Sequence, residues 1–286
     1  MKKSLNARLL LASGMAAALS VAFVHAQFGN APSKLNTVKL AADLYVIHNA
    51  FVPGNTTALV TNEGVILVDD KFEVDFANIV AEVKKITPQP IKYVINTHHH
   101  GDHSGSNAKM AALGAQLVAS EQARENMVDA KQPGQPAITF DGTAQLHLGG
   151  KEVRLYHFGR SHTNGDVVVL FPAQRTLAAG DMFTFGDDVP ELIDYSGGGS
   201  AKEWTSTLDH ALQLDFETVV PGHGNVTNKA EMRKFRDSTL RFKNRVHELV
   251  VAKKTRAEIE KAMRAEFHWA DLHVQRSLDG AIAEMQ

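Results

Sequence analysis

Histidine is the residue type that stands out in this chain: its 286 residues include 14 histidines and no cysteine. Four of the histidines lie within seven residues, in the run Thr97-His98-His99-His100-Gly101-Asp102-His103. Imidazole nitrogens and carboxylate oxygens are ligand atoms that Zn²⁺ takes in proteins, and Fe²⁺ and Mn²⁺ also accept them. The lack of cysteine excludes thiolate ligands, iron–sulfur clusters, disulfides and a cysteine nucleophile. The internal position of the run and its Asp-His ending argue against a chance histidine tract. The run therefore predicts a metal site formed by His98, His100, Asp102 and His103.

The pattern His-x-His-x-Asp-His resembles the signature of the metallo-β-lactamase superfamily. Four further segments agree with that family in the right order: Gly64–Asp69, Gly159–Asp166 around His162, Ala179-Gly180-Asp181, and Pro221-Gly222-His223-Gly224. The resemblance extends from about Val38 to Gly224, and five motifs in order make it specific. It implies the α/β fold class, as a four-layer αββα sandwich with metals at one edge between the two sheets.

The resemblance also implies which residues hold the metals. His98, His100 and His162 would bind one divalent ion; Asp102, His103 and His223 would bind a second; Asp181 would bridge the two. The ions would be Zn²⁺ first, with iron or manganese as alternatives, and a hydroxide between them would attack an electrophilic carbonyl or phosphorus. Asp102 is the expected catalytic residue, because it would bind a metal and orient the hydroxide. Asp69 either positions a ligand loop or caps a turn at the end of its strand.

Departures from particular members of the family narrow the expected reaction. Some metallo-β-lactamases have a cysteine ligand at the second metal, and this chain has none. Asp181 is instead a feature of members similar to glyoxalase II, lactonases and phosphodiesterases. Thr184 stands where quorum-quenching lactonases have a tyrosine, and His100 stands where flavin-linked diiron members have a carboxylate. We therefore expect hydrolysis of a small ester, lactone, thioester or cyclic amide resembling a β-lactam. The alternatives are a single-iron persulfide dioxygenase, a β-lactamase proper, and a metal-binding protein without turnover.

Two features near the motifs have structural as well as functional interpretations. His99 lies inside the cluster, but it should point away from the metals if its neighbours point toward them. The loop Phe183–Gly199 follows the expected bridging aspartate and contains five apolar or aromatic residues, namely Phe183, Phe185, Leu192, Ile193 and Tyr195. These side chains either line a substrate pocket or pack against the edge of the sandwich, and Met182 is expected in the core.

Hydrophobic periodicity indicates the elements that would carry these motifs. Alternating or continuous apolar runs predict strands at 38–48, 57–61, 64–69, 92–96, 115–119, 138–147, 151–158, 166–171, 176–179 and 217–220. Helical spacing predicts helices at 75–86, 107–113, 200–212 and from 228 to the end. Both halves of the chain run from strands to helices, which favours two face-to-face sheets with helices outside. We expect one domain over 27–286.

The first 26 residues have the three parts of a secretory signal peptide. Lys2, Lys3 and Arg8 precede an apolar run, and Val24-His25-Ala26 ends with a small residue. The alternative, a membrane anchor, would need a longer uninterrupted apolar run. Removing this segment would change the formal net charge from −2 to −5, which disfavours nucleic-acid binding. The expected protein is periplasmic or secreted, with a small-molecule substrate, no stable membrane insertion after cleavage, and no indication of its oligomeric state.

Overall fold

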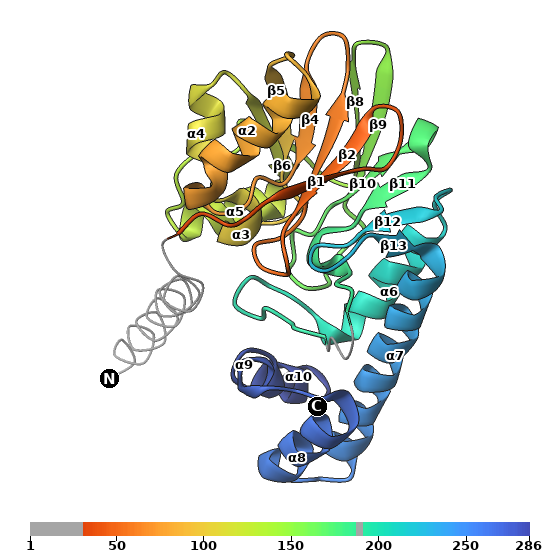
Figure 1. Ribbon diagram of the computed structural model, residues 1–286. Coiled ribbons are helices and arrows are strands. Elements are labelled where there is room, and N and C mark those ends of the chain that lie inside the picture. Colours follow the sequence, from red (N-terminus) through yellow and green to blue (C-terminus); the bar gives the residue numbers. More distant parts are fainter. Residues whose placement is uncertain (1–30, 187–190) are drawn as a thin grey trace.

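Two β-sheets form the centre of the molecule in a computed structural model that describes residues 31–186 and 191–286 (Figure 1). The expected signal peptide lies outside the described residues. The first sheet has strand order β1-β2-β3-β4-β5-β6-β7, and the second has order β13-β12-β11-β10-β9-β8. The first strands of the chain thus form one sheet and the later strands form the other.

The strands of the first sheet come before those of the second in the chain, and helices lie in several of the connections between strands. The first sheet contains β1 (Asn36–Lys39), β2 (Leu44–His48), β3 (Thr56–Val60), β4 (Val65–Val68), β5 (Ile91–Ile95), β6 (Gln116–Ser120) and β7 (Ile138–Phe140). The second contains β8 (Thr143–Leu148), β9 (Lys151–Tyr156), β10 (Val168–Phe171), β11 (Thr176–Ala178), β12 (Thr218–Val220) and β13 (Thr227–Asn228).

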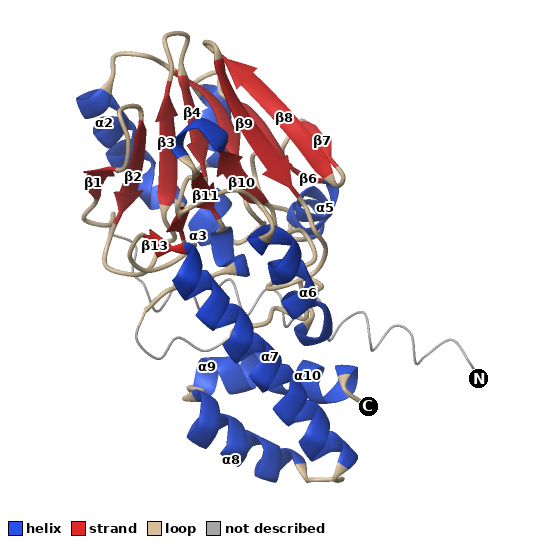
Figure 2. Ribbon diagram, turned by 90° about the vertical axis from the view of Figure 1, so that its right-hand side faces the viewer, coloured by secondary structure: helices blue, strands red, loops and turns tan. Residues whose placement is uncertain are grey.

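Helices cover the outer faces of the sheets and continue beyond the sandwich (Figures 1 and 2). The α-helices are α2 (Phe76–Ile86), α3 (Gly101–Ser104), α4 (Asn107–Ala112), α5 (Glu121–Asp129), α6 (Ala201–Leu212), α7 (Lys229–Val251), α8 (Arg256–Phe267), α9 (Asp271–His273) and α10 (Asp279–Glu284). Short 3₁₀ turns are η1 (Glu73–Asp75), η2 (Pro172–Gln174) and η3 (Gly180–Met182), and a π-helical turn, η4 (Val274–Leu278), joins α9 to α10. None of the described helices is both long and apolar enough to cross a membrane.

The four layers follow from the alternation of side chains along buried strands. In β4, Ile66 and Val68 point into the core between the sheets, whereas Val65 and Leu67 point outward to a separate core with Ile79 of α2. A third core lies on the outer face of the second sheet and includes residues of α6, α7, α8, η4 and α10. The αββα sandwich implied by the resemblance is confirmed.

The structure differs from the sequence expectations at a few elements. The segment 38–48 is two antiparallel strands, β1 and β2, rather than one. The segment 138–147 is also divided: β7 belongs to the first sheet and β8 to the second, with a turn at Gly142, whose φ is +70°. Helix α5 and strand β13 were not predicted. Alternating apolar residues cannot by themselves show where a chain leaves one sheet for another, because both sheets share the same period.

Parallel pairing gathers the chemically important residues at one edge. Strands β4 and β5 are parallel, as are β11 and β12, so their carboxyl ends reach the same edge within each sheet. Asp69 follows β4, the histidine cluster follows β5, Asp181 follows β11, and His223 follows β12. Residues more than 150 positions apart in the chain are thereby brought to one place.

Candidate active site

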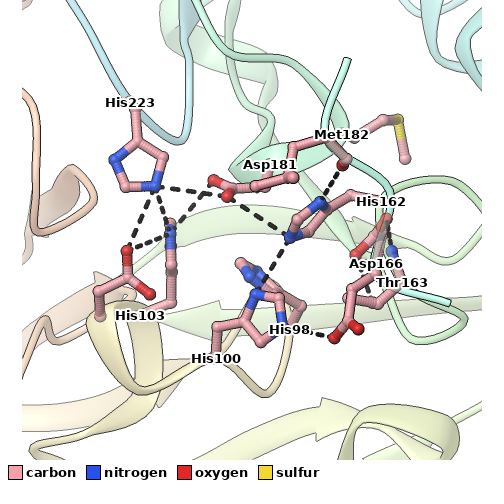
Figure 3. Close-up of polar contacts among 12 residues, drawn as sticks. His98, His100, His103, His162, Thr163, Asp166, Asp181, Met182 and His223 are labelled. Carbon is pink, nitrogen blue, oxygen red and sulfur yellow. Dashed lines mark hydrogen bonds and ion pairs between the residues drawn. The ribbon is translucent and has the colours of Figure 1, made fainter. Parts of the chain in front are cut away.

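His98, His100 and His162 form one group of converging side chains (Figure 3). Each offers a ring nitrogen, and these nitrogens lie within 4.8 Å of one another. His162 Nε2 is 3.0 Å from His100 Nδ1, and the His98 ring meets the other two rings nearly edge-on. This group matches the first of the two sites that the resemblance implied.

Asp102, His103 and His223 form a second group beside the first. His103 Nε2 lies 3.2 Å from His223 Nε2, and His223 Nε2 lies 3.3 Å from an oxygen of Asp102. Asp181 contacts both groups: its oxygens lie 3.1 Å from His103 Nε2, 3.3 Å from His223 Nε2 and 3.6 Å from His162 Nε2. Asp181 therefore occupies the position between the groups that a bridging ligand would need (Figure 3).

In each of the five histidines, the nitrogen that faces away from the group has a polar partner. In the first group, His162 Nδ1 is 2.7 Å from the Leu192 carbonyl, His100 Nε2 is 2.7 Å from Asp194, and His98 Nδ1 is 3.2 Å from the Thr97 hydroxyl. Carbonyl and carboxylate oxygens accept hydrogen bonds, and the Thr97 hydroxyl donates its own proton to Asp69 and so accepts from His98. These contacts place the ring protons on the outward nitrogens. The inward nitrogens of this group consequently present lone pairs.

The second group is oriented in the same way. His103 Nδ1 is 2.8 Å from Asp69, and His223 Nδ1 is 2.9 Å from the Phe51 carbonyl. Asp69 also accepts hydrogen bonds from the backbone N–H and the hydroxyl of Thr97, at 2.7 and 2.8 Å. Asp69 therefore contacts one histidine of the second group directly and supports the start of the histidine loop. These contacts agree with the first interpretation, a residue that positions the ligand loop, rather than with a cap on the turn after its own strand.

The donor set fits divalent metal ions. Lone pairs that face each other at 3.0 and 3.2 Å repel unless a cation or proton lies between them. His98 Nε2 is fully buried and has no hydrogen-bond partner among the described residues, a costly state for a polar atom. Burial opposes protonation of His223, yet Asp181 and Asp102 outweigh it and raise its pKa to about 10. The same carboxylates would attract a metal cation.

Two glycines allow the close approach of backbone and ligands. A Cβ at Gly54 would lie 2.2 Å from the His103 ring, and a Cβ at Gly222 would lie 2.0 Å from an Asp181 oxygen. A side chain at either position would displace His103 or Asp181. Gly101, inside the histidine cluster, is different: it begins α3, and a Cβ there would meet no atom within 4 Å, so the space at this position does not require glycine.

His99 belongs to neither of the two groups, although its ring lies beside that of His100, with centroids 4.5 Å apart, and its nitrogen converges with His100 and Asp194 in a further set. Its Nε2 lies 3.8 Å from Asp194, and burial lowers its pKa to about 3, which keeps the ring neutral. In the loop after Asp181, Phe183 and Ile193 are buried in the core outside the second sheet, as is Met182. These two loop residues therefore pack in the sandwich and do not line a pocket. Residues 187–190 lie outside the described part.

Sequence reasoning missed several groups that orient the histidines. The Asp194 carboxylate is hydrogen-bonded to His100. The carbonyls of Leu192 and Phe51 are hydrogen-bonded to His162 and His223, respectively. The two carbonyls have no signal in the sequence, because any residue type has one. Asp194 lies in a loop without a motif, and only the folded chain shows that it faces a histidine 94 positions earlier.

The model of the metallo-beta-lactamase superfamily matches residues 49–223, which include every residue of the two groups. The chain belongs to the metallo-β-lactamase superfamily. A metallo-beta-lactamase type 2 from Elizabethkingia meningoseptica is 29% identical over 206 residues, covering 68% of this chain and 81% of that protein. The 2,4-dinitroanisole O-demethylase subunit alpha from a Nocardioides strain is 30% identical over 141 residues, covering 47% and 41% of the two chains.

Solved structures of metallo-β-lactamases share the fold. One from Pontibacter korlensis superposes with a TM-score of 0.66 at 21% identity, covering 72% of this chain and 99% of that one. The DIM-1 metallo-beta-lactamase gives a TM-score of 0.63 at 18% identity, covering 72% and 97%. Within this superfamily, the chain is a metal-dependent hydrolase, and the interpretation as a metal-binding protein without turnover is set aside.

Proposed function

We propose that this protein is a dizinc hydrolase that cleaves a small ester, lactone, thioester or cyclic amide. The supporting observation is the arrangement of five imidazoles and two carboxylates in two groups of three, with Asp181 in contact with both. In this proposal His98, His100 and His162 hold one ion, and Asp102, His103 and His223 hold the other. Histidine and carboxylate ligands without thiolates suit Zn²⁺, and also iron or manganese.

Each part of the site has a defined task in the proposed reaction. Two bound ions would polarise the scissile carbonyl and acidify a water molecule enough for attack near neutral pH. Burial raises the pKa of Asp102, but His103 and His223 outweigh that effect and lower it, so Asp102 stays ionised. Its side chain is 17% exposed, more than that of His103 or Asp181, so it can accept a hydrogen bond from the attacking water and orient it.

Metal analysis combined with a substrate panel tests the proposal. We expect two zinc ions per chain and hydrolysis of at least one substrate among β-lactams, lactones, thioesters and phosphodiesters, lost on chelation and restored by zinc. One iron per chain with oxygen consumption on a persulfide would instead support the dioxygenase alternative. The relatives named as metallo-beta-lactamases make a β-lactam the first compound to test, although the second group here contains no cysteine.

Asp69→Asn should weaken the second metal site selectively. Asparagine keeps the size of the side chain and tolerates the backbone of this residue, whose φ is +63°, but it removes the charge that orients His103. Loss of such a partner typically costs about 10- to 100-fold in metal affinity. Competition with a chelator should show this loss, whereas Asp209→Asn, in an exposed ion pair with Arg236, should leave both affinities unchanged. Unaltered binding in Asp69→Asn would show that Asp69 supports only the backbone at the start of the histidine loop, through Thr97.

We also propose export to the periplasm or the medium, with cleavage after Ala26. The basis is the basic start, the apolar run and the small residue at the end of the segment. Mass spectrometry of protein from a periplasmic fraction should give an N-terminus at or near Gln27. Membrane-bound protein that begins at Met1 would contradict this proposal and support an anchor. The proposed partner is a small molecule and not a nucleic acid, given the acidic net charge.

A further inference from the structure

The C-terminal helices contact the loop that follows Asp181, although these helices lie beyond the family match, which ends at residue 223. Helix α7 leaves the second sheet next to β13, and α8 to α10 pack around its far end (Figures 1 and 2). Helix α10 contacts both α6 and α7. The π-helical turn η4 and α10 reach the segment 191–200, which follows Asp181 and carries the Leu192 carbonyl and Asp194.

Ser277, in η4, is the closest link between this helical unit and the site. Its hydroxyl oxygen accepts a hydrogen bond from the Ile193 N–H at 2.9 Å and donates one to the Ile193 carbonyl at 3.1 Å. Both residues are fully buried among apolar side chains. A buried hydroxyl that satisfies two backbone groups of one loop residue fixes the orientation of the two adjoining peptide planes.

The first of those peptide units, Leu192–Ile193, is hydrogen-bonded directly to His162. The Leu192 carbonyl and the Ile193 N–H belong to the same planar, trans peptide unit, so they point in opposite directions. On one side this unit meets Ser277, and on the other the Leu192 carbonyl accepts the hydrogen bond from His162 Nδ1 at 2.7 Å. Hydrogen bonds in such a chain also polarise and strengthen one another.

The second peptide plane supports the same histidine and its neighbour. The Ile193 carbonyl accepts a hydrogen bond from the Ser277 hydroxyl. The N–H of Asp194 in the same peptide unit donates to the His162 carbonyl at 2.9 Å. The Asp194 side chain then holds His100. Farther along the loop, Glu284 of α10 accepts hydrogen bonds from the hydroxyls of Ser200 and Tyr195 and from the Lys202 N–H.

We infer that Ser277 is a positioning residue for the first metal site, acting on His162 through the Leu192–Ile193 peptide. The C-terminal helical unit thereby completes the outer support of a site whose ligands all lie in the sandwich. This inference rests on the proposed function, because it takes His162 as a metal ligand. Glu284 supports the other end of the loop through Ser200, whose backbone N–H donates to the carbonyl of Ser161, the residue before His162, at 2.9 Å.

The test compares Ser277→Ala with wild type and with Ile259→Val, which trims the core of the same helical unit in α8. Ser277→Ala should bind one of the two zinc ions more weakly, by up to about 10-fold, the lower end of the range for loss of an outer partner of a ligand, because the Leu192 carbonyl itself remains. Cobalt substitution should show an altered absorption band for that site alone. In zinc-free protein, the NMR signal of the His162 Nδ1 proton should move, while those of His103 and His223 stay in place. Ile259→Val should change none of these readouts.

The outcomes separate this inference from the proposed function. Wild-type protein that binds fewer than two zinc ions would contradict the proposed function itself. Wild-type protein with two ions, together with a Ser277→Ala variant that has the same affinities and the same His162 signal, would overturn the inference alone. Should Ser277→Ala fail to fold, Glu284→Ala provides the second variant. It removes two hydrogen bonds to the loop, from Tyr195 and Ser200, and one to the first turn of α6, and it should weaken binding of the same zinc ion. If Glu284→Ala binds both ions with the same affinities as the wild-type protein, that result would count against the inference.

Discussion

Asp181→Ala is expected to lower the metal content below two ions per chain and to reduce kcat by more than about 100-fold, the upper range for loss of an outer-shell partner alone. Asp181 is the one described carboxylate that contacts histidines of both groups. Two cations held close together repel each other, and a shared carboxylate offsets that repulsion. The variant therefore removes a ligand from each site and leaves both less able to retain an ion.

Metal stoichiometry after dialysis and steady-state kinetics on the best substrate would measure both effects. Asp215→Ala is a suitable control, because Asp215 lies in an exposed ion pair with Arg175 away from the site. Circular dichroism should show that both variants remain folded. Two tightly bound ions and full activity in Asp181→Ala would show that this residue does not bridge the sites.

His98→Ala should empty the first site and abolish measurable turnover. A site with three protein ligands loses its defined geometry when one nitrogen is removed. His98 is fully buried, and its inward Nε2 has no alternative hydrogen-bond partner among the residues that the structure describes, so the atom has no other evident task. We expect the second ion to bind with less change, because its ligands do not include His98.

His99→Ala provides the matched control, because it alters the neighbouring histidine of the same loop. The His99 ring faces Asp194 and is a member of neither proposed metal site, and the set in which it converges, with His100 and Asp194, shares only His100 with them. The variant should retain two ions and most of its activity, with a modest loss of thermal stability from the buried volume. Zinc titration and thermal unfolding of the two variants side by side would check this. Equal loss of metal in His99→Ala, at equal folding, would mean that the wrong face of the histidine loop was assigned to the metal.

The residues of the candidate site could be predicted from local sequence because their types and spacing are chemically restrictive. His98, His100, Asp102 and His103 occupy a short loop after an apolar strand, and few structures other than a metal site bring so many ligand groups together. His162, Asp181 and His223 were found through short motifs around them. The αββα arrangement followed from the same resemblance, while the periodicity of the strands and helices was only compatible with it.

What the tertiary structure decided is the orientation of each ligand. The sequence does not show that His100 faces the site with Nδ1 while His162 uses Nε2, because that choice depends on Asp194 and on the Leu192 carbonyl. It also does not show that Ser277 supports Leu192, since this contact joins a loop to a helical turn 84 positions later. Ligand identity is a property of side-chain chemistry, which local sequence determines. Ligand orientation is a property of backbone groups and distant contacts, which come into being only when the sheets and the C-terminal helices pack together.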